Sequence, residues 1–263
     1  MITGNTKLYA IVADPISQVR TPEVLNAYFE SNNMDAVLVP IHVGVEGLEA
    51  AFAAFRSMKN LGGLIVTVPH KTAAAQLCDE LGAAGQAIGA VNAIRRTSDG
   101  RLVGNMFDGA GFVSGLRAQG HEPAGKRALL VGSGGAAGAI AFALAQAGVV
   151  SLVIANRTRA KAQDIVDRVL TAFPQISVAV GEPDPAGYEL VINATSLGMK
   201  ASDALPLDVT RLTPDTVVAE IIMKPELTPL LAQAQAAGCT VHFGRHMLDE
   251  QVRLMAEFIA ADA

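Results

Sequence analysis

The sequence predicts an α/β protein made of two domains. Short apolar runs alternate with longer amphipathic runs along the whole chain, a pattern typical of βα units built around a largely parallel sheet. The chain has 263 residues and a hydrophobic content of 51%, which is enough to fill two cores. A glycine-rich turn near the middle, between an apolar run and an alanine-rich run, indicates that a second βα series begins there.

The first half of the chain is expected to open with a strand at 8–13. Thr21-Pro22 then predicts a helix start, because threonine can cap free N–H groups and proline fits the first turn. Four apolar side chains form one face of that helix: Val24, Leu25, Tyr28 and Phe29. The next expected elements are a strand at 37–43, a helix at 48–58, a strand at 63–68, a helix at 71–81 and a strand at 91–95.

The second half is expected to begin with a strand at 128–131, followed by the glycine-rich turn and a helix at 137–147. Helical periodicity also marks the closing segment 247–260. Between these lie a strand at 152–155, a helix at 160–170, strands at 178–180, 190–193 and 217–222, and a helix at 230–237. The best domain boundary lies near Asp108-Gly109-Ala110-Gly111, where the glycines predict a hinge.

Charge and composition exclude several classes of partner. The net charge of −5 gives nucleic acid or an anionic membrane no electrostatic reason to bind. Cys78 and Cys239 stand alone, so neither a disulfide framework nor a metal site is expected. The first eight residues lack the apolar core of a signal peptide, and no apolar run is long enough to span a membrane. A soluble, cytoplasmic protein is therefore expected.

The glycine-rich turn is the strongest functional signal. It comprises Gly132, Ser133, Gly134 and Gly135, and it leads into a helix through Ala136 and Ala137. In a strand-loop-helix context, glycines let the backbone approach a pyrophosphate, and the helix presents free N–H groups and its positive end. The turn predicts a Rossmann-type dinucleotide-binding domain. The alternative is a close-packed βα turn without a ligand.

A second signal indicates which dinucleotide binds. Asn156-Arg157-Thr158 follows the next strand, 24 positions after Gly132, and contains no acidic residue to hold a ribose 2′-hydroxyl. Arg157, helped by Lys161, could instead pair with a 2′-phosphate. The alternative is an exposed helix start with two solvated cations. Because both signals fall in one βαβ unit, NADP is the favoured cofactor.

Lys71 is the candidate catalytic residue that the local pattern supports. It follows the apolar run Val66-Thr67-Val68 and Pro69-His70, and so stands at the carboxyl end of an expected strand, where open α/β sheets bind ligands. Most lysines at helix starts are only solvated. Asn92, Asp108 and Gln251 are unremarkable when each is taken alone.

An ordered set of motifs resembles the shikimate dehydrogenase family, including the quinate/shikimate dehydrogenases, along nearly the whole chain. The matching stretches are Asp14-Pro15-Ile16, Thr21-Pro22, residues 66–71, Gly89-Ala90-Val91-Asn92, Asp108-Gly109-Ala110-Gly111, residues 132–139, Asn156-Arg157-Thr158, Asn193-Ala194-Thr195-Ser196, Pro225 and Thr228-Pro229. The resemblance implies a substrate domain at 1–106, completed by a C-terminal helix at 244–263. It also implies an NADP-binding Rossmann domain at 107–243 and chemistry in a cleft.

The resemblance also implies roles for individual residues. Lys71 and Asp108 match the family's catalytic lysine and aspartate, and Asn92 and Gln251 match groups that hold ring hydroxyls. Thr67 belongs to the implied substrate site, and Thr195 and Ser196 join the cofactor site. The residue types suit the reaction, because reducing a ring ketone with NADPH requires a proton for the oxygen, which a lysine paired with a carboxylate can supply.

Four positions depart from the family pattern. The serine-x-serine pair that captures the substrate carboxylate reads Val19-Arg20-Thr21, so only the second hydroxyl remains. Ile65, Phe107 and Met223 replace an asparagine, a threonine and a tyrosine of the family. All four changes favour apolar groups. The residues implied in proton transfer match the family, whereas the side chains at 19–21 that would bind the substrate carboxylate, here called the carboxylate clamp, differ from it.

Three functional hypotheses follow. The leading one is an NADP-dependent shikimate dehydrogenase of aromatic amino acid biosynthesis, acting as a monomer or homodimer on a cyclic hydroxy acid. The second is a paralogue acting on quinate or a less polar cyclic hydroxy acid. The third is a regulatory protein that binds NADPH and a ligand without turnover, which the presence of both Lys71 and Asp108 argues against.

Overall fold

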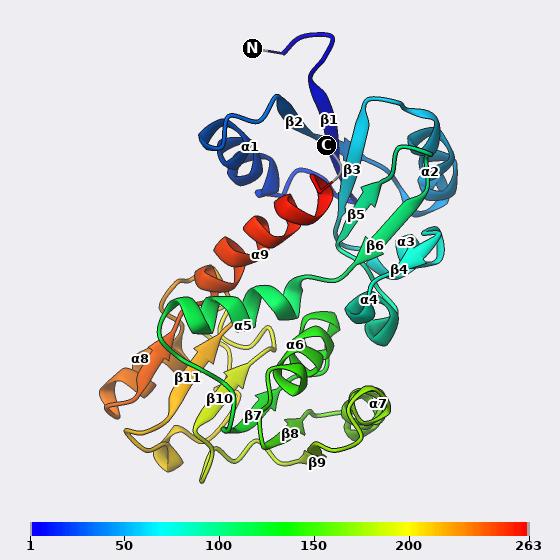
Figure 1. Cartoon of the computed structure of the whole chain (residues 1–263). Coiled ribbons are helices and arrows are strands. Elements are labelled where there is room, and N and C mark those ends of the chain that lie inside the picture. Colours follow the sequence, from blue (N-terminus) through cyan, green and yellow to red (C-terminus); the bar gives the residue numbers. More distant parts are fainter. Residues whose placement is uncertain (1, 262–263) are drawn as a thin grey trace. The chain divides into compact units, whose positions relative to one another are not determined.

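The computed structural model describes residues 2–261. The chain forms two compact units, whose elements are labelled in Figure 1. Unit 1 consists of Met1–Phe107 and Val252–Ala263, and unit 2 consists of Asp108–Gln251. Within the described residues, no helix combines the length and the apolar character that crossing a membrane requires.

Unit 1 is built on a mixed sheet with the strand order β2-β1-β3-β5-β6-β4. Its β1 pairs in parallel with β2 and β3, whereas β5 is antiparallel to β3 and β6. The strands are β1 (Lys7–Ala13), β2 (Ala36–His42), β3 (Leu61–Val66), β4 (Glu80–Leu81), β5 (Ala93–Arg96) and β6 (Leu102–Asn105). Every residue of β3 is buried, as expected for a central strand covered on both faces.

Helices cover both faces of this sheet. On one face, α2 (Leu48–Ser57) and α3 (Lys71–Gln76) pack with apolar strand residues in one core cluster. Tyr9 of β1 instead packs against Phe29 of α1 (Thr21–Ser31), with 5.2 Å between the ring centroids. The same unit also contains η1 (Val45–Gly47), α4 (Ala83–Ile88) and the end of α9 (Gly244–Ile259).

Two local predictions in unit 1 were wrong. Thr21 is not a cap, because Arg20 occupies the N-cap position of α1 and no side chain caps this helix. The helix expected at 71–81 ends at Gln76, and β4 follows. Asp79 accepts a hydrogen bond from the Leu102 backbone N–H at 2.7 Å and pairs with Arg56, so contacts distant in sequence override the helical pattern there.

Unit 2 contains a parallel sheet with the order β12-β11-β10-β7-β8-β9. Counted from its first strand this is the order 6-5-4-1-2-3 of a doubly wound Rossmann fold, with the switch point between β7 and β10. The strands are β7 (Arg127–Val131), β8 (Ser151–Ala155), β9 (Ser177–Gly181), β10 (Leu190–Asn193), β11 (Val217–Glu220) and β12 (Thr240–His242). The predicted α/β class with a Rossmann-type domain is confirmed.

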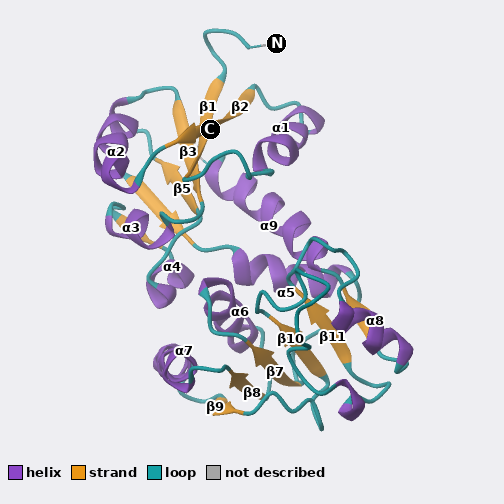
Figure 2. Cartoon of the chain, turned by 180° about the vertical axis from the view of Figure 1, so that it is seen from behind, coloured by secondary structure: helices purple, strands orange, loops and turns teal. Residues whose placement is uncertain are grey.

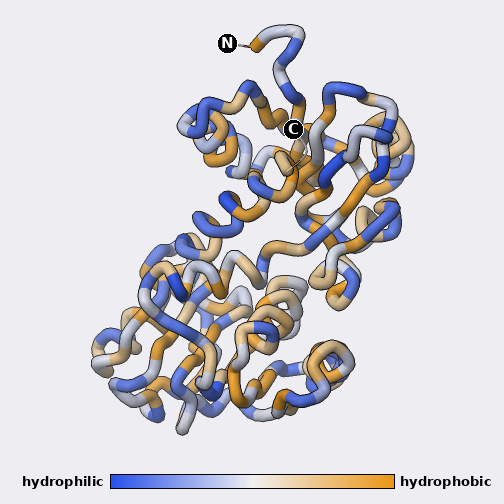
Figure 3. The backbone as a smooth tube through the Cα atoms, in the orientation of Figure 1, coloured by the Kyte–Doolittle hydropathy of each residue, from blue (hydrophilic) through white to orange (hydrophobic). Residues whose placement is uncertain are grey.

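Helices lie on both sides of this sheet as well (Figure 2). Apolar residues of α5 (Asp108–Ala118), α6 (Gly135–Gln146) and α7 (Arg159–Ala172) form one core cluster with one face of the strands. The other face packs against α8 (Pro229–Ala236) and the segment around η2 (Val209–Arg211). Figure 3 shows that hydrophobic residues occur along the strands of both sheets and that hydrophilic residues are common in the loops.

The glycines at 108–111, for which the sequence predicts a hinge, are helical in this structure. They lie in the first turn of α5, and Gly109 and Gly111 are buried. A Cβ at Gly109 would be 2.0 Å from the carbonyl oxygen of Ala139 in α6. Gly109 is therefore required for the close packing of α5 on α6 within unit 2.

Candidate active site

The glycine-rich turn in unit 2 has the geometry that a pyrophosphate needs. Gly132 follows β7 with φ of +124°, and a Cβ there would be 2.6 Å from the carbonyl oxygen of Ala194. Only glycine fits this conformation and this contact. Gly134 is the N-cap of α6 and no side chain caps the helix, so its first N–H groups are available to an anion.

A pocket of about 760 Å³ opens at the carboxyl ends of β7, β8 and β10, at the switch point of the sheet. Its lining includes most of the predicted cofactor residues: Gly132, Ser133, Gly134, Asn156, Arg157, Thr158, Lys161, Thr195 and Ser196. The other three predicted residues lie at the start of α6, outside the lining: Gly135, Ala136 and Ala137. Open α/β sheets bind dinucleotides at this place in the fold.

The charges around this pocket suit a phosphate. Arg159 forms an ion pair with Glu182 at 2.7 Å, so these two charges compensate each other. In the part of the chain that the structure describes, Arg157 and Lys161 form no ion pair. Asn156 donates from its amide to the Thr158 carbonyl at 2.9 Å, which fixes the turn that carries Arg157. The pocket therefore offers two uncompensated cations beside the end of β8.

A buried carboxylate supports the opposite wall of the pocket. Glu220 is fully buried at the end of β11 and accepts hydrogen bonds from the Asn193 amide at 3.0 and 3.1 Å and from the Thr228 hydroxyl at 3.1 Å. Burial raises the pKa of the Glu220 carboxyl, and these donors oppose the rise. Asn193 in turn accepts from the backbone N–H and the hydroxyl of Thr195, at 3.1 and 2.7 Å. The network fixes the position of Thr195.

In unit 1, several predicted substrate residues follow the carboxyl ends of the adjacent parallel strands β1 and β3. Thr67 donates its backbone N–H to Val12 of β1 at 3.1 Å, and Lys71 is the first residue of α3. Val19, half-buried, lies in the segment between β1 and α1, and Thr21 begins α1. The structure thus gathers these residues at one edge of the sheet.

The buried Asn92 and the half-buried Phe107 are also joined within unit 1. The Asn92 side-chain oxygen accepts the Phe107 backbone N–H at 2.9 Å, and the Asn92 carbonyl accepts the N–H of Val66 in β3 at the same distance. The Phe107 ring packs against Phe258, with 5.1 Å between centroids. The aromatic ring at position 107 is therefore part of a packed contact with α9.

In unit 2, Asp108 begins α5 and is 4% exposed. Gln251 of α9 donates its amide N–H to the Asp108 carboxylate, so two residues implied by the resemblance are in direct contact. Met223 is 50% exposed in the loop between β11 and α8. Lys71 belongs to unit 1 and Asp108 to unit 2.

Sequence reasoning missed some residues of the cofactor pocket: Arg159, Gly181, Glu182, Pro183, Leu197 and Pro206. Gly181 ends β9, which is parallel to β8, so its carboxyl end could have been assigned to the same edge of the sheet. Pro206 lies in a long connection after β10, and no local sequence signal indicates its place.

Comparison with known proteins agrees with this geometry. Residues 11–94 match the family described as "Shikimate dehydrogenase substrate binding domain", and residues 117–196 match "Shikimate / quinate 5-dehydrogenase". The chain is 38% identical to the shikimate dehydrogenase (NADP(+)) of Lysinibacillus sphaericus over 258 residues, which is 97% of this chain and 93% of that protein.

Two solved structures have the same fold. The shikimate 5-dehydrogenase of Listeria monocytogenes, in complex with shikimate and NAD, gives a TM-score of 0.94 at 31% identity and covers 99% of this chain and 93% of that one. The ligand-free 5-ketofructose reductase of a Gluconobacter strain gives 0.92 at 31% identity, covering 98% and 94%. Because both family descriptions match, and because the identity to the Lysinibacillus sphaericus protein extends over 97% of the chain, the chain belongs to the shikimate dehydrogenase family.

Proposed function

We propose that this protein is an NADP-dependent shikimate dehydrogenase that reversibly converts 3-dehydroshikimate and NADPH to shikimate and NADP⁺. The observation that carries the proposal is the pocket at the switch point of unit 2, with its glycine turn and the cations Arg157 and Lys161. The proposal is supported by the relative at 38% identity, which bears this name. Unit 1 would then be the substrate domain.

The residues present in the pocket fit NADP. The Gly132 turn and the uncapped start of α6 would hold the pyrophosphate. Arg157 and Lys161 would pair with the 2′-phosphate, and no carboxylate at 156–158 competes for the ribose hydroxyl. When bound, the nicotinamide supplies or accepts the hydride.

We assign the proton transfer to Lys71. In the reductive direction its ammonium group would donate a proton to the carbonyl oxygen as that carbon receives the hydride, and in the oxidative direction its amine would take the proton back. Asp108 would be the carboxylate of the reaction, and Gln251 donates a hydrogen bond that holds this carboxylate in position. Asn92 and Gln251 would hold ring hydroxyls of the substrate, and Thr67 would belong to the same site.

The carboxylate end of the substrate site is where this chain differs from its family. Thr21 offers one hydroxyl, and Val19 offers none. Arg20 is no replacement for the lost hydroxyl, because its guanidinium is exposed and paired with Glu23 at 2.9 Å. We therefore expect the carboxylate to be bound more weakly than by a pair of serines.

An absorbance assay at a wavelength of about 340 nm, where NADPH absorbs, tests the proposal. Shikimate and quinate are each offered with NADP⁺ and with NAD⁺, and 5-ketofructose, as a ketone without a carboxylate, is offered with NADPH. The expected result is turnover of shikimate with NADP⁺ above every other pair. Faster turnover of another substrate would assign the enzyme to that substrate, and no turnover of any would contradict the proposal. The Lys71→Ala variant, purified in parallel, detects contaminating dehydrogenase.

We further propose a cytoplasmic monomer or homodimer. The proposed location rests on composition, since the sequence has no basic excess and no apolar stretch of spanning length. Light scattering coupled to size exclusion measures the mass in solution and distinguishes one copy of 27.2 kDa from two.

A further inference from the structure

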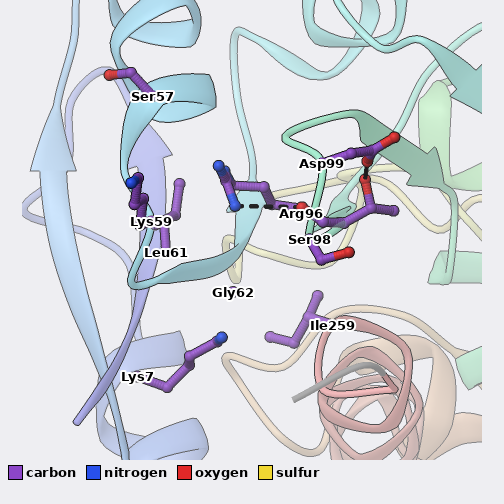
Figure 4. A pocket seen from close by; sticks show the side chains of 10 residues that line it. Lys7, Ser57, Lys59, Leu61, Gly62, Arg96, Ser98, Asp99 and Ile259 are labelled. Carbon is purple, nitrogen blue, oxygen red and sulfur yellow. Dashed lines mark hydrogen bonds between the residues drawn. The ribbon is translucent and has the colours of Figure 1, made fainter. Parts of the chain in front are cut away.

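We propose that unit 1 carries a second ligand site, which takes a small organic anion through a carboxylate or phosphate group. A cavity of about 440 Å³ is lined by two lysines, an arginine and two serines, shown in Figure 4. These residues are Lys7, Ser57, Lys59, Arg96 and Ser98. The volume falls within the range of small-molecule sites.

The cavity lies away from the residues proposed to bind substrate. Lys7 and Leu61 are the first residues of the parallel strands β1 and β3. Thr67 and Lys71 follow the other end of β3. The cavity is therefore at the amino-terminal edge of these strands, and a ligand there would not compete with the substrate.

The cations around this cavity have no carboxylate partner in the described part of the chain. Most arginines of the chain form ion pairs on the surface. Among residues 2–261, Arg96, Lys7 and Lys59 form none, and Arg157 in the proposed 2′-phosphate pocket shares this property. The protein as a whole has a net charge of −5, which repels anions, but this cluster of cations attracts them locally.

Asp99, the one carboxylate among the described lining residues, does not neutralise these cations. Asp99 accepts a hydrogen bond from the hydroxyl of Thr97, and its oxygen is 3.5 Å from the backbone nitrogen of Arg101. Both contacts lie within the turn that carries Asp99. Hydrogen bonding to Thr97 lowers the pKa of the Asp99 carboxyl, which stays ionised at neutral pH. With three cations and one carboxylate, the lining carries a net charge of about +2.

Arg96 is held in place before any ligand binds. Its Nε and Nη2 donate to the carbonyl oxygen of Arg56 at 3.1 and 2.8 Å, and its Nη1 donates to the carbonyl oxygen of Thr97 at 3.2 Å. A guanidinium has five N–H donors, so two remain for an oxyanion. Because the side chain is already ordered, binding costs less conformational entropy.

Three further lining residues are apolar or lack a side chain. Leu61 and Ile259 are each 1% exposed, and Gly62 contributes no side chain to the wall. The Tyr9 ring lies against Gly62, and its buried hydroxyl has no hydrogen-bond partner among the described residues. Because a cavity of about 440 Å³ is larger than a bare oxyanion, the ligand that fills it has an organic body beside its anionic group.

Titration of the full-length ¹⁵N-labelled protein with phenyl phosphate, benzoate and inorganic phosphate tests the site by NMR. We expect saturable shifts of the Gly62, Ser98 and Asp99 amides with at least one organic probe. Phenyl phosphate and benzoate distinguish a phosphate from a carboxylate ligand. Shifts at Gly132 and Gly134 report binding in the cofactor pocket instead.

Lys7→Met should weaken the binding at Gly62 by about 10-fold or more, as expected for loss of one charge-assisted contact. The matched control is Lys126→Met, since Lys126 directly precedes β7 of unit 2 as Lys7 begins β1. Shifts confined to the cofactor pocket, binding of inorganic phosphate alone, or equal affinities of wild type and Lys7→Met would each overturn the proposal. Because binding is read without turnover, this outcome is independent of the proposed dehydrogenase activity.

Discussion

Replacing His242 with phenylalanine should remove part of the acid sensitivity of unit 2. His242 lies on β12 with its side chain fully buried, and neither ring nitrogen has a hydrogen-bond partner within residues 2–261. The rings of Phe112, His121 and His246 lie around it, at centroid distances of 5.9, 6.2 and 5.0 Å. Burial, together with the neighbouring His246 and His121, lowers the pKa of His242 from 6.5 to about 3.

The direction of the effect follows from this lowered pKa. The folded protein keeps His242 neutral, whereas the unfolded chain binds a proton below about pH 6.5. The stabilising contribution is therefore complete above pH 6.5 and is lost as the pH falls from 6.5 toward 3. At about 1.4 kcal/mol per pH unit, the loss at pH 5 is about 2 kcal/mol. Phenylalanine keeps a ring of similar size and cannot bind a proton.

Urea unfolding followed by circular dichroism, at pH 7.5 and pH 5.0 and equal ionic strength, measures this loss. The wild type should lose about 2 kcal/mol more than His242→Phe between the two pH values. Burial also lowers the pKa values of His121 and His246, but both histidines are present in the wild type and in the variant. The same holds for the charged groups near them, which are Lys126 near His121 and Arg245, Asp249 and Glu226 near His246. His42→Gln, at an exposed histidine, is the control. Equal losses in wild type and His242→Phe would refute the reasoning.

Four further changes test the proposed function. Lys71→Ala should lower kcat by about 10²–10⁴-fold with a small effect on NADP binding, and an unchanged kcat excludes Lys71 from proton transfer. Arg157→Ala should weaken NADP binding by about 10- to 150-fold in calorimetric titration, and an equal loss for NAD contradicts its assignment to the 2′-phosphate. Val19→Ser should lower the KM for shikimate by restoring a hydroxyl to the clamp, and no gain would indicate a different substrate. Glu220→Gln should raise the KM for NADP more than that for shikimate, because Thr195 loses its support, whereas equal rises would indicate general destabilisation.

The parts of the fold that depend on local patterning were predictable from the sequence. The strand before Gly132, the turn and α6 form one continuous signal, so their identity and order could be read directly. The helix after Lys71 ends early because Asp79 bonds to Leu102 and Arg56, residues more than 20 positions away. Such contacts leave no periodic trace near Asp79.

In the candidate site, too, the residues placed by local sequence order were predictable and those placed by distant contacts were not. Arg157 and Lys161 could be assigned because they follow the strand that comes after the glycine turn. The pairing of Asn193 with Glu220 joins the ends of two strands 27 residues apart, so the motif at 193–196 did not reveal its buried partner. Gly109 also has a packing role that the sequence pattern did not reveal, because it lies against Ala139 of α6 in unit 2.

The division of unit 1 into two segments affects the order in which the protein can fold during synthesis. Its sheet is complete by residue 107, but Met255 and Ile259, which are buried in unit 1, belong to the end of α9. During translation the whole of unit 2 is therefore synthesised before the residues that complete the core of unit 1. Unit 2 is one contiguous segment and can fold first, whereas the nascent unit 1 keeps the Phe107 ring without its partner Phe258 until translation is almost finished.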